Sequence, residues 1–233
     1  MIMHPVIERA RSEARTILTE IESKELLGQA GINITDTRLA TSSSEAVTIS
    51  SQLGFPVVLK IASPDILHKN DAGGVRLALQ TPVQVEEAYD EILKSVGQNY
   101  PQARVQGVSV QKMAPPGVEV VIGMSKDAQF GPVLMFGLGG ILVEIIEDVS
   151  LRVTPITRKD AAEMIKEIKG YRLLAGYRGQ EPVDTSKLED MLLAISGFVE
   201  ENPVVKELDL NPVLAYSDNA IAVDARVILE DLN

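Results

Sequence analysis

One short stretch near the C-terminus, from Lys206 to Pro212, alternates between polar and apolar residues. Successive side chains of a β-strand point to opposite faces, so Glu207, Asp209 and Asn211 share one face and two leucines share the other. A row of oxygen-bearing side chains suits a hard cation better than it suits a protein core. The stretch therefore predicts a strand with one apolar side and one side of oxygen ligands.

A second strand is predicted to fold back along this one. The segment 220–224 is apolar until it ends in Asp224. If the turn is centred at residues 217–218, Asn211 lies directly opposite Asp224, with Cβ atoms roughly 5 Å apart. We then expect Asp209, Asn211 and Asp224 to come within reach of one Mg²⁺, which takes few protein oxygens and adds water and phosphate. The strand pattern alone fits this metal site and an exposed polar face equally well.

Two further residues suit phosphate chemistry. Lys60 ends the apolar stretch 56–61 and could meet phosphate oxygens, or it could simply reach solvent. His68 lies in the polar loop 63–74, and an imidazole can attack a phosphoryl group as a nucleophile. Taken alone, each position fits an ordinary surface side chain better than a functional one.

A glycine-rich turn and two glutamates complete the candidate residues. The turn 137–140 follows the predicted strand 133–136, and its backbone N–H groups could cradle an anion. It matches neither the dinucleotide-binding fingerprint nor the P-loop pattern, and a plain tight turn explains it as well. Glu144 lies on the next element. Glu119 follows a Pro-Pro-Gly turn and fits either a ribose contact or a surface position.

The chain has 233 residues, which is enough for two compact lobes. Its formal net charge of −11 argues against a nucleic-acid partner, but a nucleotide needs only a few local cations and backbone N–H groups. The absence of cysteine excludes disulfides, thiolate metal sites and a cysteine nucleophile. No apolar run approaches the roughly 20 residues that span a bilayer, so we expect a cytoplasmic protein without a membrane partner.

The hydrophobic pattern predicts a mixture of helices and hairpin strands. Helices are expected over 6–30, from Ser42 toward 54, and over 82–96, 159–168 and 186–200. Strands are expected over 32–40, 56–61, 75–79, 105–113, 118–124, 133–136, 204–215 and 220–229. Hairpins among these strands indicate an α+β class, with a hinge between two lobes near 113–117.

The order of these signals resembles that of an ATP-grasp domain. More narrowly, the segments 54–60, 63–74 and 208–212 resemble the β subunit of ADP-forming acetyl-CoA synthetase, a relative of succinyl-CoA synthetase. The resemblance covers about residues 22 to 229, and the histidine loop is its most specific part. It implies an ATP-grasp fold of two α/β lobes with the nucleotide bound between them. The expected division is a helical extension over 1–21, a first lobe with the histidine loop over 22–113, and a second lobe with the Mg²⁺ site over 114–233.

The resemblance also implies a role for each candidate residue. His68 would be the second phosphorylated histidine and would hand its phosphoryl group to ADP, while Glu144 would orient or polarise a histidine. The remaining roles are phosphate binding by Lys60, adenine binding by Gln111, Lys112 and Met113, ribose binding by Glu119, and Mg²⁺ binding by Asp209, Asn211 and Asp224.

The family reaction converts acyl-CoA, ADP and phosphate into acid, CoA and ATP. The chain lacks a dinucleotide-type glycine fingerprint and a second histidine in a suitable position, so CoA binding and acyl handling are expected on a separate α subunit in an α₂β₂ assembly. One alternative is a stand-alone ATP-grasp carboxylate–amine ligase, which would have no use for His68. Another is a nucleotide-sensing module without catalysis, which need not keep its Mg²⁺ ligands.

Overall fold

The chain divides into two compact units, and each is built from more than one segment. Unit 1 comprises Met1–Leu18, Glu22–Ile34 and Pro116–Asn233, and unit 2 comprises Thr19–Ile21 and Thr35–Pro115. The computed structural model describes residues 4–66, 68–140 and 148–231. Residues 22–34 therefore pack with the C-terminal part of the chain, whereas the sequence assigned them to the first lobe. In the described residues no helix is both long and apolar enough to cross a bilayer.

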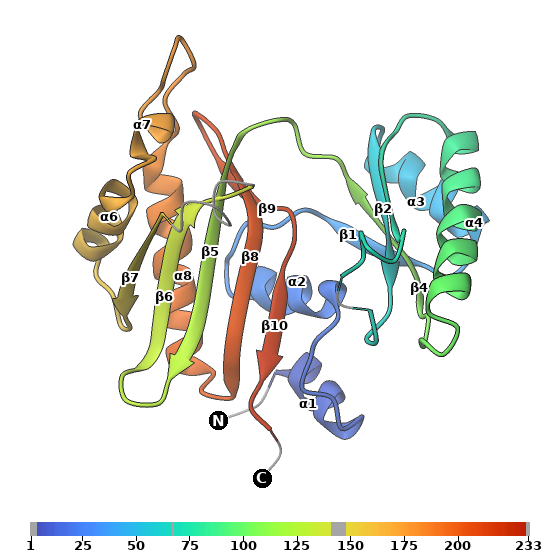
Figure 1. The fold of residues 1–233 in the computed structure, drawn as a ribbon, viewed down its shortest axis with the longest axis horizontal. Helices are drawn as coiled ribbons and strands as arrows, with labels where there is room; N and C mark the ends of the chain where they lie inside the picture. Colours follow the sequence, from blue (N-terminus) through green and yellow to red (C-terminus); the bar gives the residue numbers. More distant parts are fainter. Residues whose placement is uncertain (1–3, 67, 141–147, 232–233) are drawn as a thin grey trace. The chain divides into compact units, whose positions relative to one another are not determined.

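Unit 2 is an antiparallel sheet covered by two helices, with strand order β1-β4-β2-β3. Its elements are β1 (Thr37–Ala40), α3 (Ser43–Leu53), β2 (Val57–Ala62), β3 (Val75–Leu79), α4 (Pro82–Asn99) and β4 (Gly107–Lys112). Helices α3 and α4 contact each other and pack on β4 and β2, as Figure 1 shows. The side chains of Leu59 and Val110 enter this core. Because strand residues alternate, Lys60, Ser109 and Gln111 lie on the sheet face opposite the helices.

The N-terminus of α3 carries a displaced version of a capping box. The hydroxyl of Ser42 accepts a hydrogen bond from the Glu45 backbone N–H at 3.2 Å. The Glu45 carboxylate, however, accepts from the backbone N–H of Thr41 and not from that of Ser42. The helix therefore begins where the sequence predicted, with its reciprocal bond one residue earlier.

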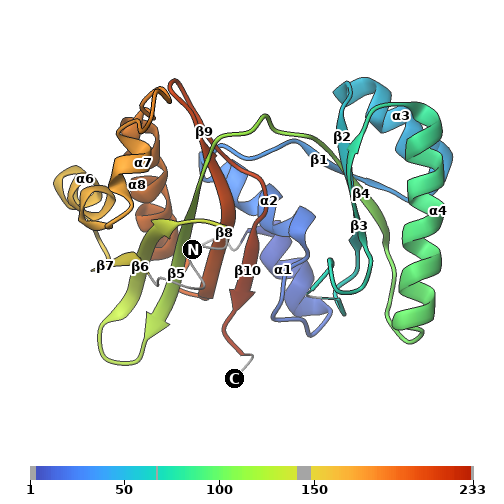
Figure 2. The same cartoon turned by 45° about the horizontal axis from the view of Figure 1, so that its top comes forward.

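Unit 1 contains a six-stranded antiparallel sheet with strand order β10-β8-β5-β6-β7, and β9 pairs with β8. Its strands are β5 (Val118–Asp127), β6 (Gly131–Leu138), β7 (Val149–Val153), β8 (Val205–Ala215), β9 (Ala220–Ala222) and β10 (Arg226–Leu229). Its helices are α1 (Pro5–Ser12), α2 (Glu20–Gln29), α6 (Arg158–Glu167), α7 (Tyr171–Leu174) and α8 (Thr185–Glu201), although the first two residues of α2 belong to unit 2. Helices α6 and α8 contact each other and lie beside β6 and β7 (Figure 2). The α+β class is confirmed.

The single helix predicted over 6–30 is wrong, because residues 13–19 interrupt it. The backbone N–H of Leu18 donates to the Val227 carbonyl at 3.1 Å, so this segment pairs with β10 instead of continuing the helix. The apolar residues of α1 also enter the core of unit 1. Pairing with β10, a strand from the far end of the sequence, overrides the local helical pattern.

A buried ion pair holds the interrupting segment in place. The guanidinium of Arg15 donates to both oxygens of the Glu22 carboxylate at 2.9 and 2.8 Å, and the two side chains are only 8% and 11% exposed. Arg15 also donates to the Ile17 carbonyl at 3.1 Å. A two-point pair of this kind fixes orientation as well as distance.

We predict that Arg15→Ala destabilises unit 1 by about 3 kcal/mol, because it leaves the Glu22 carboxylate buried beside fewer positive charges. The measurement is thermal unfolding followed by circular dichroism. The matched control is Arg38→Ala, which breaks an exposed pair with Asp36 and should leave the midpoint unchanged. Equal shifts in the two variants would contradict the prediction.

Candidate phosphate and metal sites

The hairpin of β8 with β9 and β10 has the register that the sequence predicted. Val213 pairs with Ala222 on one side of a break in the second strand, and Asp209 pairs with Arg226 on the other side. Asp224 lies in the break itself. This register sets Asp224 across from Asn211, at a point between the paired segments β9 and β10.

The two faces of β8 differ as predicted. Leu208 and Leu210 are buried in the core of unit 1, at 2% and 0% exposure. On the other face, Asp209 is half-buried and Asn211 is exposed. The oxygen-bearing side chains therefore line one side of a strand whose other side is held by the core.

Asp224 lies close enough to Asp209 to affect the protonation of the Asp209 carboxyl. Burial raises the pKa of the Asp209 carboxyl, the positive charge of Arg226 opposes that rise, and the negative charge of Asp224 adds to it. Two carboxylates that repel each other are a suitable pair of ligands for a divalent cation.

This donor set fits Mg²⁺ better than a cation with an all-protein cage. Within the described residues there is no group of three or more His, Cys, Asp or Glu side chains arranged to hold a metal ion. Two carboxylates and one amide oxygen leave coordination positions to water and phosphate, which is the usual arrangement for Mg²⁺.

Glu119 on β5 lies beside the glycine turn that follows β6. The backbone N–H of Gly139 donates to the Glu119 carbonyl at 2.7 Å. Gly140 has a φ of 67°, and a Cβ at this position would come within 2.9 Å of the Glu119 carboxylate. A residue larger than glycine would crowd that carboxylate. The first two residues of the predicted turn belong to β6 instead, and Glu144 lies outside the described residues.

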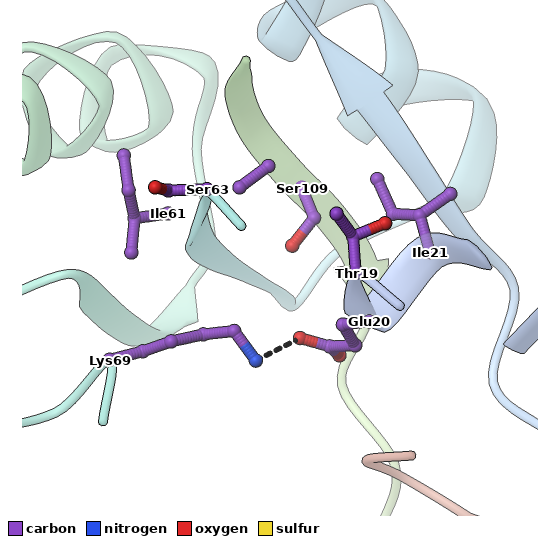
Figure 3. Close-up of a pocket in the computed structure, with 8 residues that line it drawn as sticks. Thr19, Glu20, Ile21, Ile61, Ser63, Lys69 and Ser109 are labelled. Atoms are coloured by element: carbon purple, nitrogen blue, oxygen red, sulfur yellow. Dashed lines mark ion pairs between the residues drawn. The ribbon is translucent and has the colours of Figure 1, made fainter. Parts of the chain in front are cut away.

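In unit 2, Lys60 is buried on the sheet face opposite the helices. Its ammonium group lies 2.8 Å from one carboxylate oxygen of Glu20, and the ammonium group of Lys69 lies 2.8 Å from the other oxygen. Figure 3 shows Lys69 and Glu20 pointing toward each other. Both residues line a small cavity of about 10 Å³. This cavity has room for roughly one water molecule.

The three residues predicted to line an adenine lie together at the end of β4. Gln111 is buried, and the backbone N–H of Met113 donates to the Pro56 carbonyl at 3.0 Å. The Lys112 ammonium donates to the carbonyls of Gly54 and Phe55 at 2.8 and 2.6 Å. Lys112 therefore supplies hydrogen bonds to two carbonyl groups that directly follow α3, and these bonds fix the direction of its side chain.

His68 is exposed, but residues on both sides of it are anchored. The Asp65 carboxylate accepts hydrogen bonds from the Arg104 guanidinium and backbone N–H, and these bonds hold the pKa of Asp65 below its usual range. After the histidine, the backbone N–H of Gly74 donates to the Lys69 carbonyl at 2.8 Å. The loop thus presents an imidazole from a backbone tied at two points.

Sequence reasoning did not predict that Glu20 and Lys69 would lie against Lys60. Glu20 lies 40 positions before Lys60, and the helical pattern around it made it one surface charge among several. Lys69 was visible only as the residue after His68 in the histidine loop. That adjacency was the one available signal.

Comparisons with known proteins place the chain among relatives of one family. Residues 9–229 match the family model of the ATP-grasp domain. The chain is 48% identical over 224 residues to the acetate–CoA ligase (ADP-forming) I subunit beta of Pyrococcus furiosus, which covers 96% of each chain.

Solved structures of one archaeal protein are also similar. The dinucleotide-forming acetyl-coenzyme A synthetase 1 of Ca. Korarchaeum cryptofilum, in complex with coenzyme A, Ca-AMPCP and HgCl⁺, has a TM-score of 0.95 and 48% identity, covering 97% of this chain and 98% of that chain. A second structure of that protein, with coenzyme A and Mg-AMPPCP, has a TM-score of 0.87 and 45% identity with the same coverage. Its phosphohistidine segment is described as pointing towards the nucleotide binding site.

We predict that Asp224→Asn lowers the pKa of the Asp209 carboxyl in metal-free protein, because it removes the like charge that favours the protonated form. Arg226→Gln should raise the same pKa, since it removes the opposing positive charge. The measurement is a carbon-13 NMR titration of the Asp209 carboxyl, with Asp218→Asn on the exposed turn as the control. Shifts of the same sign in the first two variants would refute the assigned charge pattern.

Proposed function

The chain belongs to the ATP-grasp family and to the β subunits of ADP-forming acetate–CoA ligases, and on that premise we propose that it is the nucleotide-binding subunit of an ADP-forming acyl-CoA synthetase. The observation that carries the proposal is 48% identity over 96% of both chains to a protein named as such a subunit. The neighbouring Asp209 and Asp224 carboxylates and the buried Lys60 support it from the structure.

The proposed reaction moves one phosphoryl group in three steps. Phosphate displaces CoA from acyl-CoA and gives an acyl phosphate. The acyl phosphate then gives its phosphoryl group to a histidine and releases the acid, and finally ADP takes the group and becomes ATP. We assign His68 as the histidine of this chain that exchanges with the nucleotide. The exposure of its imidazole supports this role, because a carrier must be accessible to both the phosphoryl donor and the acceptor.

The side chains that would hold the nucleotide are proposed as follows. Lys60 would contact the phosphates, since it is a buried cation on a polar sheet face. The end of β4, with Gln111, Lys112 and Met113, would contact the adenine. Glu119 would contact the ribose hydroxyls, and the adjacent glycine turn leaves its carboxylate uncrowded.

Asp209, Asn211 and Asp224 would hold Mg²⁺, and Asp209 thereby has a role in catalysis. Bound there, Mg²⁺ would offset the negative charge of the phosphates during transfer. Protonation of Asp209 would compete with metal binding, so its raised pKa favours loss of the ion as the pH falls.

A partner is part of the proposal. The Pyrococcus furiosus relative is named as a subunit beta, so we propose an α subunit that binds CoA and handles the acyl group, in an α₂β₂ assembly. The acid would be selected on that subunit.

Two further assignments belong to the proposal. Glu144 would orient or polarise a histidine. The compartment would be the cytoplasm, which suits a chain without cysteine.

We predict that incubation with γ-labelled ATP, Mg²⁺ and the purified partner subunit gives this chain an acid-labile, base-stable label. His68→Asn should remove the label, because the imidazole nitrogen that accepts the phosphoryl group is gone. His4→Asn is the matched control, since His4 is the only other histidine, and it should keep the label. A label that persists in His68→Asn would exclude His68 from the mechanism.

We further predict that Asp224→Ala abolishes the Mg²⁺-dependent labelling and leaves the fold intact, because it removes one of two carboxylates from the metal site. Asp218→Ala, on the exposed turn before β9, should label normally. Phosphate transfer and circular dichroism are measured on the same samples. Unchanged labelling in Asp224→Ala would contradict the metal site.

A further inference from the structure

A single buried carboxylate joins two lysines from different parts of unit 2. The Glu20 side chain is 4% exposed, and its two oxygens each lie 2.8 Å from an ammonium group, that of Lys60 and that of Lys69. Lys60 comes from β2, whereas Lys69 comes from the loop that carries His68. Figure 3 shows Glu20 reaching across to Lys69.

The Glu20 carboxylate allows the two ammonium groups to lie close together. Ammonium groups that both touch one carboxylate are close enough to repel each other strongly in a poorly hydrated place. The side chains of Lys60 and Lys69 are 8% and 19% exposed, so water screens this repulsion only in part. The negative charge of Glu20 offsets it. The Lys60 ammonium donates a hydrogen bond to one carboxylate oxygen, and the Lys69 ammonium is held at the other oxygen as an ion pair.

Through Lys69 this carboxylate also acts on the histidine loop. Lys69 follows His68 directly, and its carbonyl accepts the backbone N–H of Gly74 at 2.8 Å. The Gly74 carbonyl in turn accepts the N–H of Ile61 on β2 at 2.7 Å. The backbone beside His68 is therefore tied to the strand of Lys60 twice, once by main-chain bonds and once by Glu20.

We propose that Glu20 is a positioning residue for phosphoryl transfer at His68, an inference that rests on the function proposed above. Its carboxylate holds the Lys69 ammonium beside that of Lys60, so that two cations face the phosphoryl group in transit. In this step the bond from the γ-phosphorus to the bridging oxygen of ATP breaks, and a bond to the unprotonated imidazole nitrogen forms. ADP leaves with the electron pair, and no proton is transferred.

The first test measures single-turnover phosphorylation of His68 by labelled ATP and Mg²⁺ in the complex with the partner subunit. Glu20→Gln should lower the rate at saturating ATP by about tenfold, the effect of losing one charge-assisted hydrogen bond. The half-saturating ATP concentration should change much less, because the lost interaction acts on the transfer step. Glu87→Gln, an exposed change on α4, is the control and should behave as the unmodified chain.

A double-mutant cycle separates Glu20 acting through Lys69 from a general loss of stability. Lys69→Gln should lower the rate by a similar factor, and Glu20→Gln should add little to it. If the two effects multiply, Glu20 does not act through Lys69 and the proposal is overturned. Lys69 is partly exposed, so its variant provides the same test should Glu20→Gln fail to fold.

The second test uses no reaction. Hydrogen exchange on the full chain should speed up at the amides of Ala72, Gly73 and Gly74 in Glu20→Gln and in Lys69→Gln. Asp65→Asn should loosen the start of the loop instead, because it breaks the pair with Arg104. Unchanged exchange at 72–74 in Glu20→Gln overturns the positioning role. Absence of label on His68 in the unmodified complex would overturn the proposed function, and the exchange result would still stand.

Discussion

Strand β8 can bury only one of its two faces, and much of unit 1 depends on that choice. Leu208 and Leu210 enter the core under the helices, so Asp209 and Asn211 must point to the other side. The core thus fixes the direction of the carboxylates without touching them. The raised pKa of Asp209 follows from the same arrangement, because burial and the charge of Asp224 both disfavour its ionised form. Core packing on one side of the strand and the row of oxygen-bearing side chains on the other are linked by alternation alone.

The sequence was sufficient wherever the controlling interactions are local. The alternation in β8 and a short turn set the hairpin register, and the observed pair of Val213 with Ala222 follows it. Gly31, just after α2, adopts the positive φ that glycine favours where a helix ends. The ATP-grasp fold was predicted from the family resemblance, because the motifs of that family come in a fixed order along the chain. The roles of the individual site residues stay predictions.

The sequence was insufficient wherever distant segments decide the structure. Strand β7 was missed because its pattern is inverted: Leu151 is 55% exposed, whereas the hydroxyl of Ser150 is buried and donates to the Met164 carbonyl of α6. The break between α1 and α2 depends on pairing with β10, and no local pattern reports it. Glu20 was missed for a similar reason, since its lysine partners lie far along the chain. A charge on an amphipathic helix looks the same whether it faces solvent or a buried ammonium group.

The way unit 1 is assembled from both ends of the chain has a consequence for its biosynthesis. Helices α1 and α2 are translated before unit 2, yet Ile7 and Leu27 are buried in one core with strands that are translated after it. Unit 2 is almost continuous in sequence and can fold while translation proceeds. The apolar faces of the first two helices must wait on the order of ten seconds for β8 and β10. Nascent chains of this protein should therefore need chaperone protection of α1 and α2, although the folded unit buries Ile7 and Leu27 completely.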